Sequence, residues 1–514
     1  MKPSGPGTKR RKKLKVTMPR SESSLQVMDV VEVTLPRSIP PRQQDAAPPP
    51  DARGDEEEEG VDHISSLPDA ILGDIISLLS MKEGARTQIL SSRWRHSWRA
   101  APLVLDGSEL VTPMDLRTDE KVLAADDKAL TSTVSLILST HSGPGRRFCI
   151  PAHHLSDRAT TVDSWLRSPA LDNLQELDFW DDGIYGYLRQ FAPVPPPASA
   201  FRFSGTLRVA TFGKCQLPDG LVEGIHFPNL KQLGLEYVNI SEGSLHAMIS
   251  SCPVLECLLL HLSFGFSCLR ISSSSLKSIG VGTNRYRNQP QLREIIIADA
   301  PCLERLLFLE PYMSISVSVI AAPKLETLGF PTDGIDGYDP FRIEFGTTTI
   351  QELQVINMTT VVRSVKILAV RSMHINLDMV IDLMKCFPCL EKLYIKRCIS
   401  RDMNRWCRKQ RQFIKCFDIH LKTIVLKEYR GTRSQVNFAS FFLQNAKKLE
   451  LMTLEVDNRV ANCAFFAEQY GVLQMEKRAS RTAQLQFTTK RCRRDAHVNH
   501  VRDLAITDPF ECRC

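Results

Sequence analysis

The chain has 514 residues and carries 65 Lys and Arg against 58 Asp and Glu, a formal net charge of +7. Its 43% hydrophobic residues are typical of a globular protein, and the modest charge argues against nucleic acid as a partner. No run of about 18 apolar residues occurs, so we expect no membrane span. The N-terminus lacks the apolar core of a secretory signal, and we expect a protein of the nucleus or cytoplasm whose 15 cysteines are reduced.

Residues 1–60 have the composition of a disordered leader. A proline-rich stretch covers residues 36–50, and an unbroken acidic run covers residues 55–59. Like charges repel, and few side chains here are apolar enough to be buried. A basic block near the start is a candidate nuclear import signal or a weak phosphate-binding arm: Lys9, Arg10, Arg11, Lys12, Lys13 and Lys15.

Residues 61–100 predict a small unit of three helices. Pro68 suits the first turn of a helix, with Ser65 and Ser66 as possible caps. A break over residues 81–84 precedes a short helix over residues 85–88, and a third helix carries Leu90, Trp94 and Trp98 at a spacing of four. The first helix has apolar residues on more than one face: Ile71, Leu72, Ile75, Ile76, Leu78 and Leu79. So short a unit cannot bury them all, and we expect a partner.

The middle of the chain repeats a pattern of apolar residues, as in LKQLGL from Leu230, LERLLF from Leu303 and LEKLYI from Leu390. The spacing, 25 residues from Leu230 to Leu255 for example, is that of leucine-rich repeats. The pattern begins at Leu174, Leu207, Leu230, Leu255, Leu276, Leu292, Leu303, Leu325, Ile350, Val365, Leu390, Leu421 and Leu449. We expect residues 101–410 to form an α/β solenoid, with parallel strands on its concave face and helices or irregular segments on its convex face.

Two further strands are expected before these repeats, at residues 103–105 and 148–150, with Val134, Ile137 and Leu138 on a helix between them. In the repeats, strand residues that flank the inward-pointing apolar positions are candidates for contact with a partner. They are Gln232, Gly234, Glu236, Glu391, Lys392 and Tyr394. Their orientation depends on the geometry of each coil.

No catalytic motif is present, and we expect no enzyme, no cofactor and no metal site. Cys386, Cys389, Cys398 and Cys407 allow a zinc site, but the first two flank a Phe-Pro turn of a repeat, which favours a structural role. His153, His154, His226, His246, His374 and His420 are expected to be surface or satisfied core residues. The basic residues around Trp406 allow an acidic partner or phosphate groups, although a solvated loop is the simpler interpretation: Arg401, Arg405, Arg408, Lys409, Arg411 and Lys415.

Residues 61–98 resemble an F-box, through Leu67-Pro68-Asp69, the Ile/Leu-rich first helix and the ending LSSRWRHSW. Many members have proline where this chain has Met81, a departure that should only loosen the turn. The resemblance implies docking on a Skp-type adaptor, and through it on a cullin–RING ubiquitin ligase. Carried over by position, the residues divided between the adaptor and helix packing are Leu67, Pro68, Ile71, Ile75, Leu79, Leu90 and Trp94.

Residues 413–456 resemble the FBD module of plant F-box and leucine-rich-repeat proteins, through His420-Leu421-Lys422, Tyr429-Arg430-Gly431 and Lys448-Leu449-Glu450, and we assign residues 411–490 to an FBD-like cap. We expect a strand, a helix and a strand that cap the solenoid, followed by a tail over residues 491–514. Together the two resemblances imply a non-catalytic substrate receptor of an SCF-type ligase that holds an unknown protein target. The alternatives are a repeat scaffold without ligase activity and an adaptor-bound protein that acts outside degradation.

Overall fold

The computed structural model describes residues 64, 66–110, 120–180, 193–283, 290–310, 313–332, 340–372, 377–397, 419–489 and 496–511. Contacts divide the chain into residues 1–62 and residues 63–514, so every described residue belongs to the second unit. The basic block at Lys9 to Lys15, the basic residues around Trp406, Cys398 and Cys407 lie outside the described residues. None of the described helices is both long and apolar enough to cross a lipid bilayer.

The first part of this unit is helical, as predicted. It comprises α1 (Asp69–Leu78), α2 (Met81–Arg86), the 3-10 turn η1 (Thr87–Ile89) and α3 (Ser92–Ala100). The second helix begins at Met81, four residues earlier than the predicted short helix, because Ser80 and Glu83 form a capping box around its first turn. Pro68 occupies the N-cap of α1 without a side-chain cap, and Ser91 caps α3 by accepting from Trp94 N–H.

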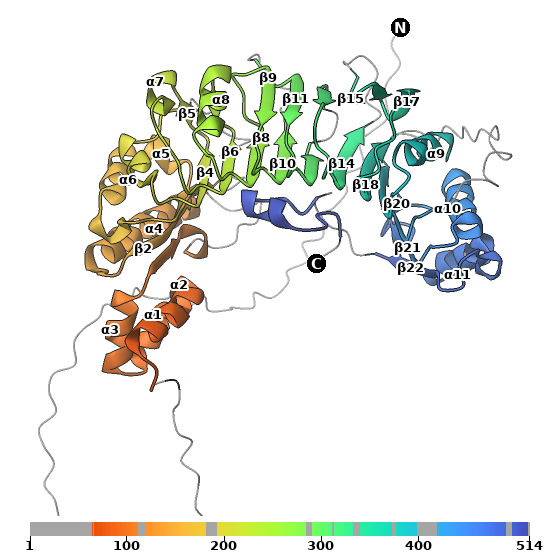
Figure 1. The fold of residues 1–514 in the computed structure, drawn as a ribbon. Helices are drawn as coiled ribbons and strands as arrows, with labels where there is room; N and C mark the ends of the chain where they lie inside the picture. Colours follow the sequence, from red (N-terminus) through yellow and green to blue (C-terminus); the bar gives the residue numbers. More distant parts are fainter. Residues whose placement is uncertain are drawn as a thin grey trace, which may run out of the picture. The chain divides into compact units, whose positions relative to one another are not determined.

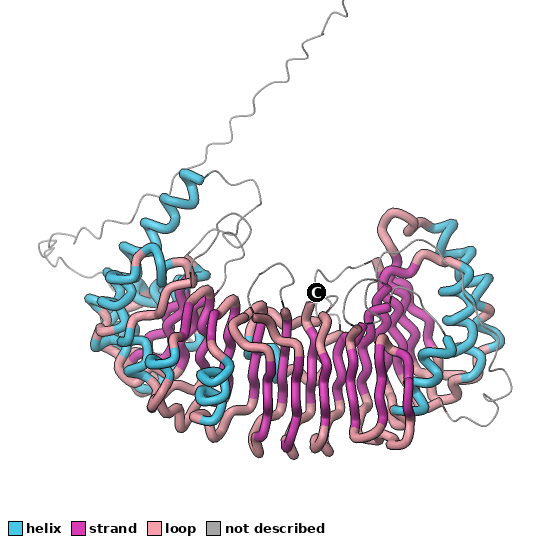
Figure 2. The backbone as a smooth tube through the Cα atoms, turned by 90° about the horizontal axis from the view of Figure 1, so that it is seen from above, coloured by secondary structure: helices cyan, strands magenta, loops and turns pink. Residues whose placement is uncertain are grey.

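A long parallel sheet runs through the rest of the unit (Figure 2). Its 14 strands have the order β1-β2-β3-β4-β6-β8-β10-β12-β14-β18-β19-β20-β21-β22. The predicted solenoid is therefore confirmed. The strands are β1 (Leu103–Asp106), β2 (Gly145–Pro151), β3 (Glu176–Trp180), β4 (Val209–Gly213), β6 (Gln232–Glu236), β8 (Cys257–His261), β10 (Ser278–Gly282), β12 (Arg305–Phe308), β14 (Thr327–Thr332), β18 (Ile367–Ser372), β19 (Lys392–Arg397), β20 (Thr423–Tyr429), β21 (Leu451–Val456) and β22 (Gln484–Thr488).

Helices cover the convex side of this sheet at its two ends (Figure 2). Near the N-terminal end lie α4 (Glu120–Thr140), α5 (His154–Asp157), α6 (Ala159–Leu166), α7 (Asp219–Val222) and α8 (Glu242–Ser250), with the short turns η2 (Gly107–Glu109), η3 (Pro169–Leu171) and η4 (Ala198–Phe203). The paired strands β5 (Gln216–Leu217) and β7 (Asn239–Ile240) join them. Near the C-terminal end lie α9 (Leu377–Cys386), α10 (Arg433–Asn445), α11 (Cys463–Leu473) and η6 (Met475–Lys477).

The middle of the convex side differs from the prediction of helices or irregular segments, because a second sheet lies there. It contains β9 (Cys268–Ser272), β11 (Glu294–Asp299), β13 (Ser316–Val319), β15 (Arg342–Phe345), β16 (Thr348–Gln351) and β17 (Gln354–Asn357). Its segments are short and alternate buried with exposed residues, as in EIIIAD, which favours strands over helices. Two predicted repeat starts, Leu292 and Ile350, are therefore wrong: they open no strand of the long sheet and belong to this second one.

The unit has two apolar layers, one on each face of the long sheet. The larger lies between the sheet and the convex elements and contains the inward residues of the repeats, such as Leu233 and Leu235. The smaller lies on the concave face, where residues 496–511, including η7 (Val501–Ala505), cross the strands (Figure 1). Part of the predicted tail is therefore packed against the solenoid, which the sequence did not indicate.

Candidate binding surfaces

The helical unit at residues 66–100 has a small core of its own. Leu72, Ile76, Trp94 and Ala101 are buried together, and Leu67 and Trp98 pack against them. Arg93 ties the start of α1 to α3 by donating to Asp69 Oδ1 at 2.8 Å and to the Leu67 carbonyl. The core uses one face of α1 and the tryptophan side of α3, as the spacing of Trp94 and Trp98 predicts.

Apolar side chains outside this core remain in contact with solvent. On α1, Ile71 is 45% and Leu78 is 78% exposed, and the spacing of seven residues places them on one face. At the end of η1, Ile89 and Leu90 are 85% and 64% exposed. These four residues, here called the exposed apolar group, are not covered by the rest of the described chain.

The residues predicted to meet an adaptor divide between the core and this surface. Ile71, Leu90 and Pro68 are exposed, and Ile75 and Leu79 are half-buried. Trp94, only 7% exposed, packs in the helical core, and Leu67 packs against it, so these two residues position the helices. Leu78 and Ile89 were not assigned to the adaptor surface from the sequence, because helical spacing alone does not tell which of several apolar faces is buried.

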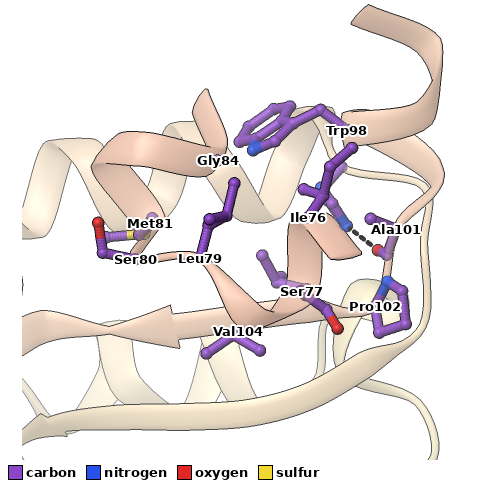
Figure 3. Close-up of a pocket in the computed structure, with 12 residues that line it drawn as sticks. Ile76, Ser77, Leu79, Ser80, Met81, Gly84, Trp98, Ala101, Pro102 and Val104 are labelled. Carbon is purple, nitrogen blue, oxygen red and sulfur yellow. Dashed lines mark hydrogen bonds between the residues drawn. The ribbon is translucent and has the colours of Figure 1, made fainter. Parts of the chain in front are cut away.

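The helical unit meets the first repeat around a small cavity of about 30 Å³, which residues of both parts line. Figure 3 shows Ile76, Trp98 and Ala101 around it. His141 Nε2 donates to the Ala101 carbonyl at 2.8 Å, and the imidazole meets the Trp98 indole edge-on. Burial lowers the pKa of His141, although the bond to Ala101 opposes this shift. The neutral imidazole therefore fits this junction.

Met81 adds a second tie at the junction. Its backbone N–H donates to Glu109 Oε2 at 2.7 Å, which links the start of α2 to η2 after the first strand. Proline has no N–H and cannot make this bond. The expectation that Met81 only loosens the turn is therefore wrong, because the residue holds the two parts together.

The second surface is the concave face of the sheet, and residues 496–511 already cover part of it. At the N-terminal side, His500 Nε2 lies 3.0 Å from Asp178 Oδ2 and 2.9 Å from Thr211 Oγ1. His500 Nδ1 accepts from Arg502 N–H, so Nε2 carries the proton that faces the carboxylate. Arg502 itself pairs with Glu176. The segment thus meets acidic residues of β3 through one hydrogen-bond donor, His500, and one cation, Arg502.

Apolar contacts hold the centre of the segment. Leu504 and Phe510 lie over Gly280 and Gly329, where an added Cβ would come within 2.8 and 2.7 Å of their side chains. Phe510 also meets the rings of Phe330 and Tyr394, with centroids 5.1 and 5.4 Å away. The two glycines leave space on the sheet that the segment fills.

Asp508 anchors the C-terminal side of the segment to β19. Its Oδ2 accepts from Lys392 Nζ at 2.8 Å and from Tyr394 Oη at 2.9 Å. Burial raises the pKa of Tyr394, and Asp508 raises it further, so the phenol keeps the proton that it donates. Burial alone would lower the pKa of Lys392, but Asp508 outweighs this effect and raises it.

This arrangement changes the role of several predicted partner contacts. Lys392 and Tyr394 bind the chain's own segment, and Glu391 pairs with Lys422 at 2.8 Å. On β6, Gly234 and Glu236 are buried and Gln232 is half-buried. Glu391 keeps a 40% exposed side chain that pairs with Lys422 and not with the segment. The other five residues are buried or half-buried, and the sequence missed this cover because the segment is about 100 to 270 residues away in the chain.

The region predicted as a capping module continues the long sheet with β20, α10 and β21, the predicted order of strand, helix and strand. It adds α11 and β22, the last strand. Gln469 of α11 accepts from Tyr429 Oη at 2.7 Å, which joins the added helix to β20. Burial raises the pKa of Cys386 to about 11, so this member of the predicted cysteine cluster is a protonated thiol.

His154 departs from the expectation of a surface or satisfied core histidine, whereas its neighbour His153 bonds to Asp127 Oδ1 at 3.2 Å, as expected. They stack on each other, and both face Asp127 of α4. His154 is fully buried, but neither of its ring nitrogens has a hydrogen-bond partner in the described part of the chain. It is therefore neither a surface histidine nor a satisfied core histidine.

Two family models match the repeats and the region after them. The model described as "FBD-associated F-box protein At5g56370, LRR repeats" covers residues 162–395, and the model described as "FBD" covers residues 409–454. The second match overlaps the module predicted at residues 411–490. Neither match includes the helical unit.

Curated proteins of Arabidopsis thaliana are similar over most of the chain. The F-box/FBD/LRR-repeat protein At5g53840 is 24% identical, over 79% of this chain and 90% of its own length. The F-box/LRR-repeat protein At3g58930 is 23% identical, over 76% and 89%. The F-box/FBD/LRR-repeat protein At1g13570 is 28% identical over a shorter match, 42% of this chain and 47% of its own length.

Proposed function

Because the chain belongs to the plant F-box/LRR-repeat proteins with a C-terminal FBD module, we propose that it is the substrate receptor of an SCF-type cullin–RING ubiquitin ligase. In this role the helical unit binds a Skp-type adaptor and the solenoid holds a protein target. The receptor carries no catalytic residue of its own. It acts by raising the concentration of target lysines near the conjugating enzyme.

The exposed apolar group is the observation that carries this proposal. Thirteen large apolar side chains are exposed in the described residues. The four of this group and Ile64 make five of them, all between residues 64 and 90. Solvent-exposed apolar surface concentrated on so small a unit is typical of a protein-binding surface. The remaining part of the chain packs on a different side of the unit, through Met81, Trp98 and His141.

Binding to a purified Skp-type adaptor tests the proposal directly. The double variant Ile71→Glu/Leu90→Glu places two charges on the exposed apolar group and leaves the helical core intact. Burying one such side chain contributes about 1.5–3 kcal/mol, so we expect the adaptor affinity to fall at least tenfold. Titration calorimetry measures the affinity, and circular dichroism checks that the fold is kept.

Ile320→Glu is the matched control, because Ile320 is 65% exposed but lies just after β13, in the second sheet. This variant should bind the adaptor like the wild type. If the wild type fails to bind, or if the double variant binds equally well, the receptor function is refuted. The chain is then better described as a scaffold without ligase activity.

The target surface in this proposal includes the outer side of residues 496–511. Asn499, Ala505 and Thr507 are exposed there, while the strands beneath are covered. A photo-crosslinker placed at Thr507 should therefore form covalent crosslinks to ubiquitylated target proteins when the proteasome is inhibited. The same crosslinker at Ile320 on the convex side should not, and equal crosslinking at both positions would exclude this surface.

We further propose that the receptor acts in the nucleus or the cytoplasm. The basic block from Lys9 to Lys15 supports nuclear import by its composition. A fluorescent fusion in which these six basic residues are replaced by alanine should shift from the nucleus to the cytoplasm. An unchanged distribution would remove the import role of the block.

A further inference from the structure

Asp127 of α4 and the His153–His154 pair at the start of α5 form a polar cluster away from both binding surfaces. The Nε2 atoms of His153 and His154 lie 3.2 and 3.1 Å from the same carboxylate oxygen, Asp127 Oδ1. The three ligand atoms lie within 4.8 Å of one another. Two imidazole nitrogens and one carboxylate oxygen form a donor set suited to zinc.

His154 is the least expected member of the cluster. Its side chain is fully buried, and neither Nδ1 nor Nε2 makes a hydrogen bond with the described residues. Nε2 lies 3.1 Å from Asp127 Oδ1, the same oxygen that His153 Nε2 contacts. Buried polar atoms are almost always satisfied, so a nitrogen that faces the cluster without a bond indicates a missing partner.

The spacing of the ligand atoms fits a tetrahedral zinc ion. Bonds of about 2.0 Å to nitrogen and oxygen place neighbouring ligand atoms about 3.3 Å apart. The two nitrogen-to-oxygen distances, 3.2 and 3.1 Å, are close to this value. An ion between the atoms would need only small side-chain movements.

Arg158 supports the orientation of the carboxylate. Its Nε and Nη2 atoms donate to Asp127 Oδ2 at 3.1 and 2.5 Å, which leaves Oδ1 for the histidines. A carboxylate that binds a metal through one oxygen is commonly held by a hydrogen bond to the other. Arg158 therefore need not compete with an ion.

We propose that Asp127 Oδ1, His153 Nε2 and His154 Nε2 bind one zinc ion. Water fills the fourth position, because the side chains of Asp127 and His153 are 20% and 11% exposed and open the site to solvent. The ion joins α4 to the turn before α6 and replaces the bond that His154 lacks. The inference is independent of the ligase function. The sequence showed no motif, because 26 residues separate Asp127 from His153.

Zinc content of the purified full-length protein tests the site. After incubation with zinc sulfate and gel filtration, elemental analysis should find one zinc per chain. The variants Asp127→Asn and His154→Gln should lose this zinc. Bound zinc should raise the Tm of the wild type by several degrees and leave that of Asp127→Asn unchanged, because the ion binds only the folded site.

His246→Gln is the control, since His246 is also a repeat histidine but accepts a hydrogen bond from Arg270 N–H at 3.0 Å. It should keep the zinc. Cobalt substitution then distinguishes this site from any cysteine site, because thiolate ligands add a charge-transfer band that two histidines and a carboxylate lack. His153 is the more exposed of the two histidines, so His153→Gln gives a second loss-of-binding test if His154→Gln does not fold.

Two results would overturn the proposal. The first is a wild-type protein that binds no stoichiometric zinc and whose Tm does not change on zinc addition. Asp127, Arg158 and the histidines would then form only an ion-pair cluster. The second is zinc that remains in both Asp127→Asn and His154→Gln, or a cobalt spectrum with a thiolate band.

Discussion

Single residues at the junction between α3 and β1 decide how the helical unit is held. Met81 contributes its backbone N–H, and His141 contributes a neutral imidazole that bonds to the Ala101 carbonyl. Both contacts join residues far apart in the chain, 28 and 40 positions, so neither follows from helix periodicity. Met81 acts in two ways, because its N–H bonds to Glu109 and its side chain is buried in the larger apolar core.

Replacing Met81 with proline should weaken the junction. Proline suits the first position of a helix, so α2 should remain, while the bond to Glu109 is lost. A hydrogen bond to a charged group contributes about 1.5–3 kcal/mol. Met81→Pro should therefore lower the free energy of unfolding by about this amount in urea titrations. Met81→Leu keeps the N–H and serves as the control; equal stability of the two variants would show that the bond contributes nothing.

Acid should weaken the same junction through His141. Burial lowers the pKa of this imidazole in the folded protein below its ordinary value of 6.5. Below pH 6.5 the unfolded chain therefore takes up a proton that the folded chain resists, and stability falls as the pH decreases from there. His141→Gln keeps a neutral donor and should show a smaller drop in Tm between pH 7.5 and pH 5.5. An identical drop in wild type and variant would exclude His141 as the cause.

At the scale of elements, the C-terminal segment and the strands beneath it are complementary in charge and in shape. Arg502 pairs with Glu176 of β3 and Asp508 with Lys392 of β19, while the imidazole of His500 lies 3.0 Å from the Asp178 carboxylate. Between these anchors, side chains of the segment fill the space above two strand glycines. Glycine within a strand weakens it and often marks a close approach of another segment, which is the case here.

Gly329→Ala should loosen this segment. An added Cβ would lie 2.7 Å from Phe510 Cζ and 2.8 Å from Leu307 Cδ2, so one of these buried side chains must move. We expect stability to fall by about 1–3 kcal/mol, as for other overpacked sites. Amide hydrogen exchange should rise at least tenfold in residues 496–511, because their contacts are lost.

Gly205→Ala is the matched control for this prediction, because a Cβ at Gly205 meets nothing within 4 Å. It should leave both stability and exchange unchanged. Unchanged exchange in Gly329→Ala would show that Phe510 does not depend on the space above the glycine.

For the whole molecule, periodic patterns predicted the order of elements well. The helices around Trp94 and the strands that follow Leu230, Leu255 and Leu390 are set by local apolar spacing, which a sequence displays directly. The second sheet was missed because segments such as CLRIS and SVSV are too short to distinguish from irregular coil. The concave cover and the Asp127–histidine cluster were missed because they join residues that are distant in sequence.

Removing residues 496–514 should destabilise the whole solenoid. Apolar residues on the concave face, including Leu259, Leu307 and Phe330, would lose their cover. The truncated chain should bind a hydrophobic dye strongly, and its Tm should fall by several degrees. Removal of residues 1–60 is the control and should leave the Tm unchanged. A wild-type Tm in the protein that lacks residues 496–514 would contradict the packing role of the segment.

The position of this segment also sets when the protein can mature during synthesis. Repeat arrays usually fold progressively, since each repeat contacts only its neighbours. Here Arg502 must reach Glu176, 326 residues earlier, before the concave face is covered. At 5–20 residues per second, a ribosome needs on the order of tens of seconds to bridge that interval. During this interval the nascent repeats expose an apolar concave face that chaperones can recognise. A chain that terminates before residue 496 keeps this face exposed.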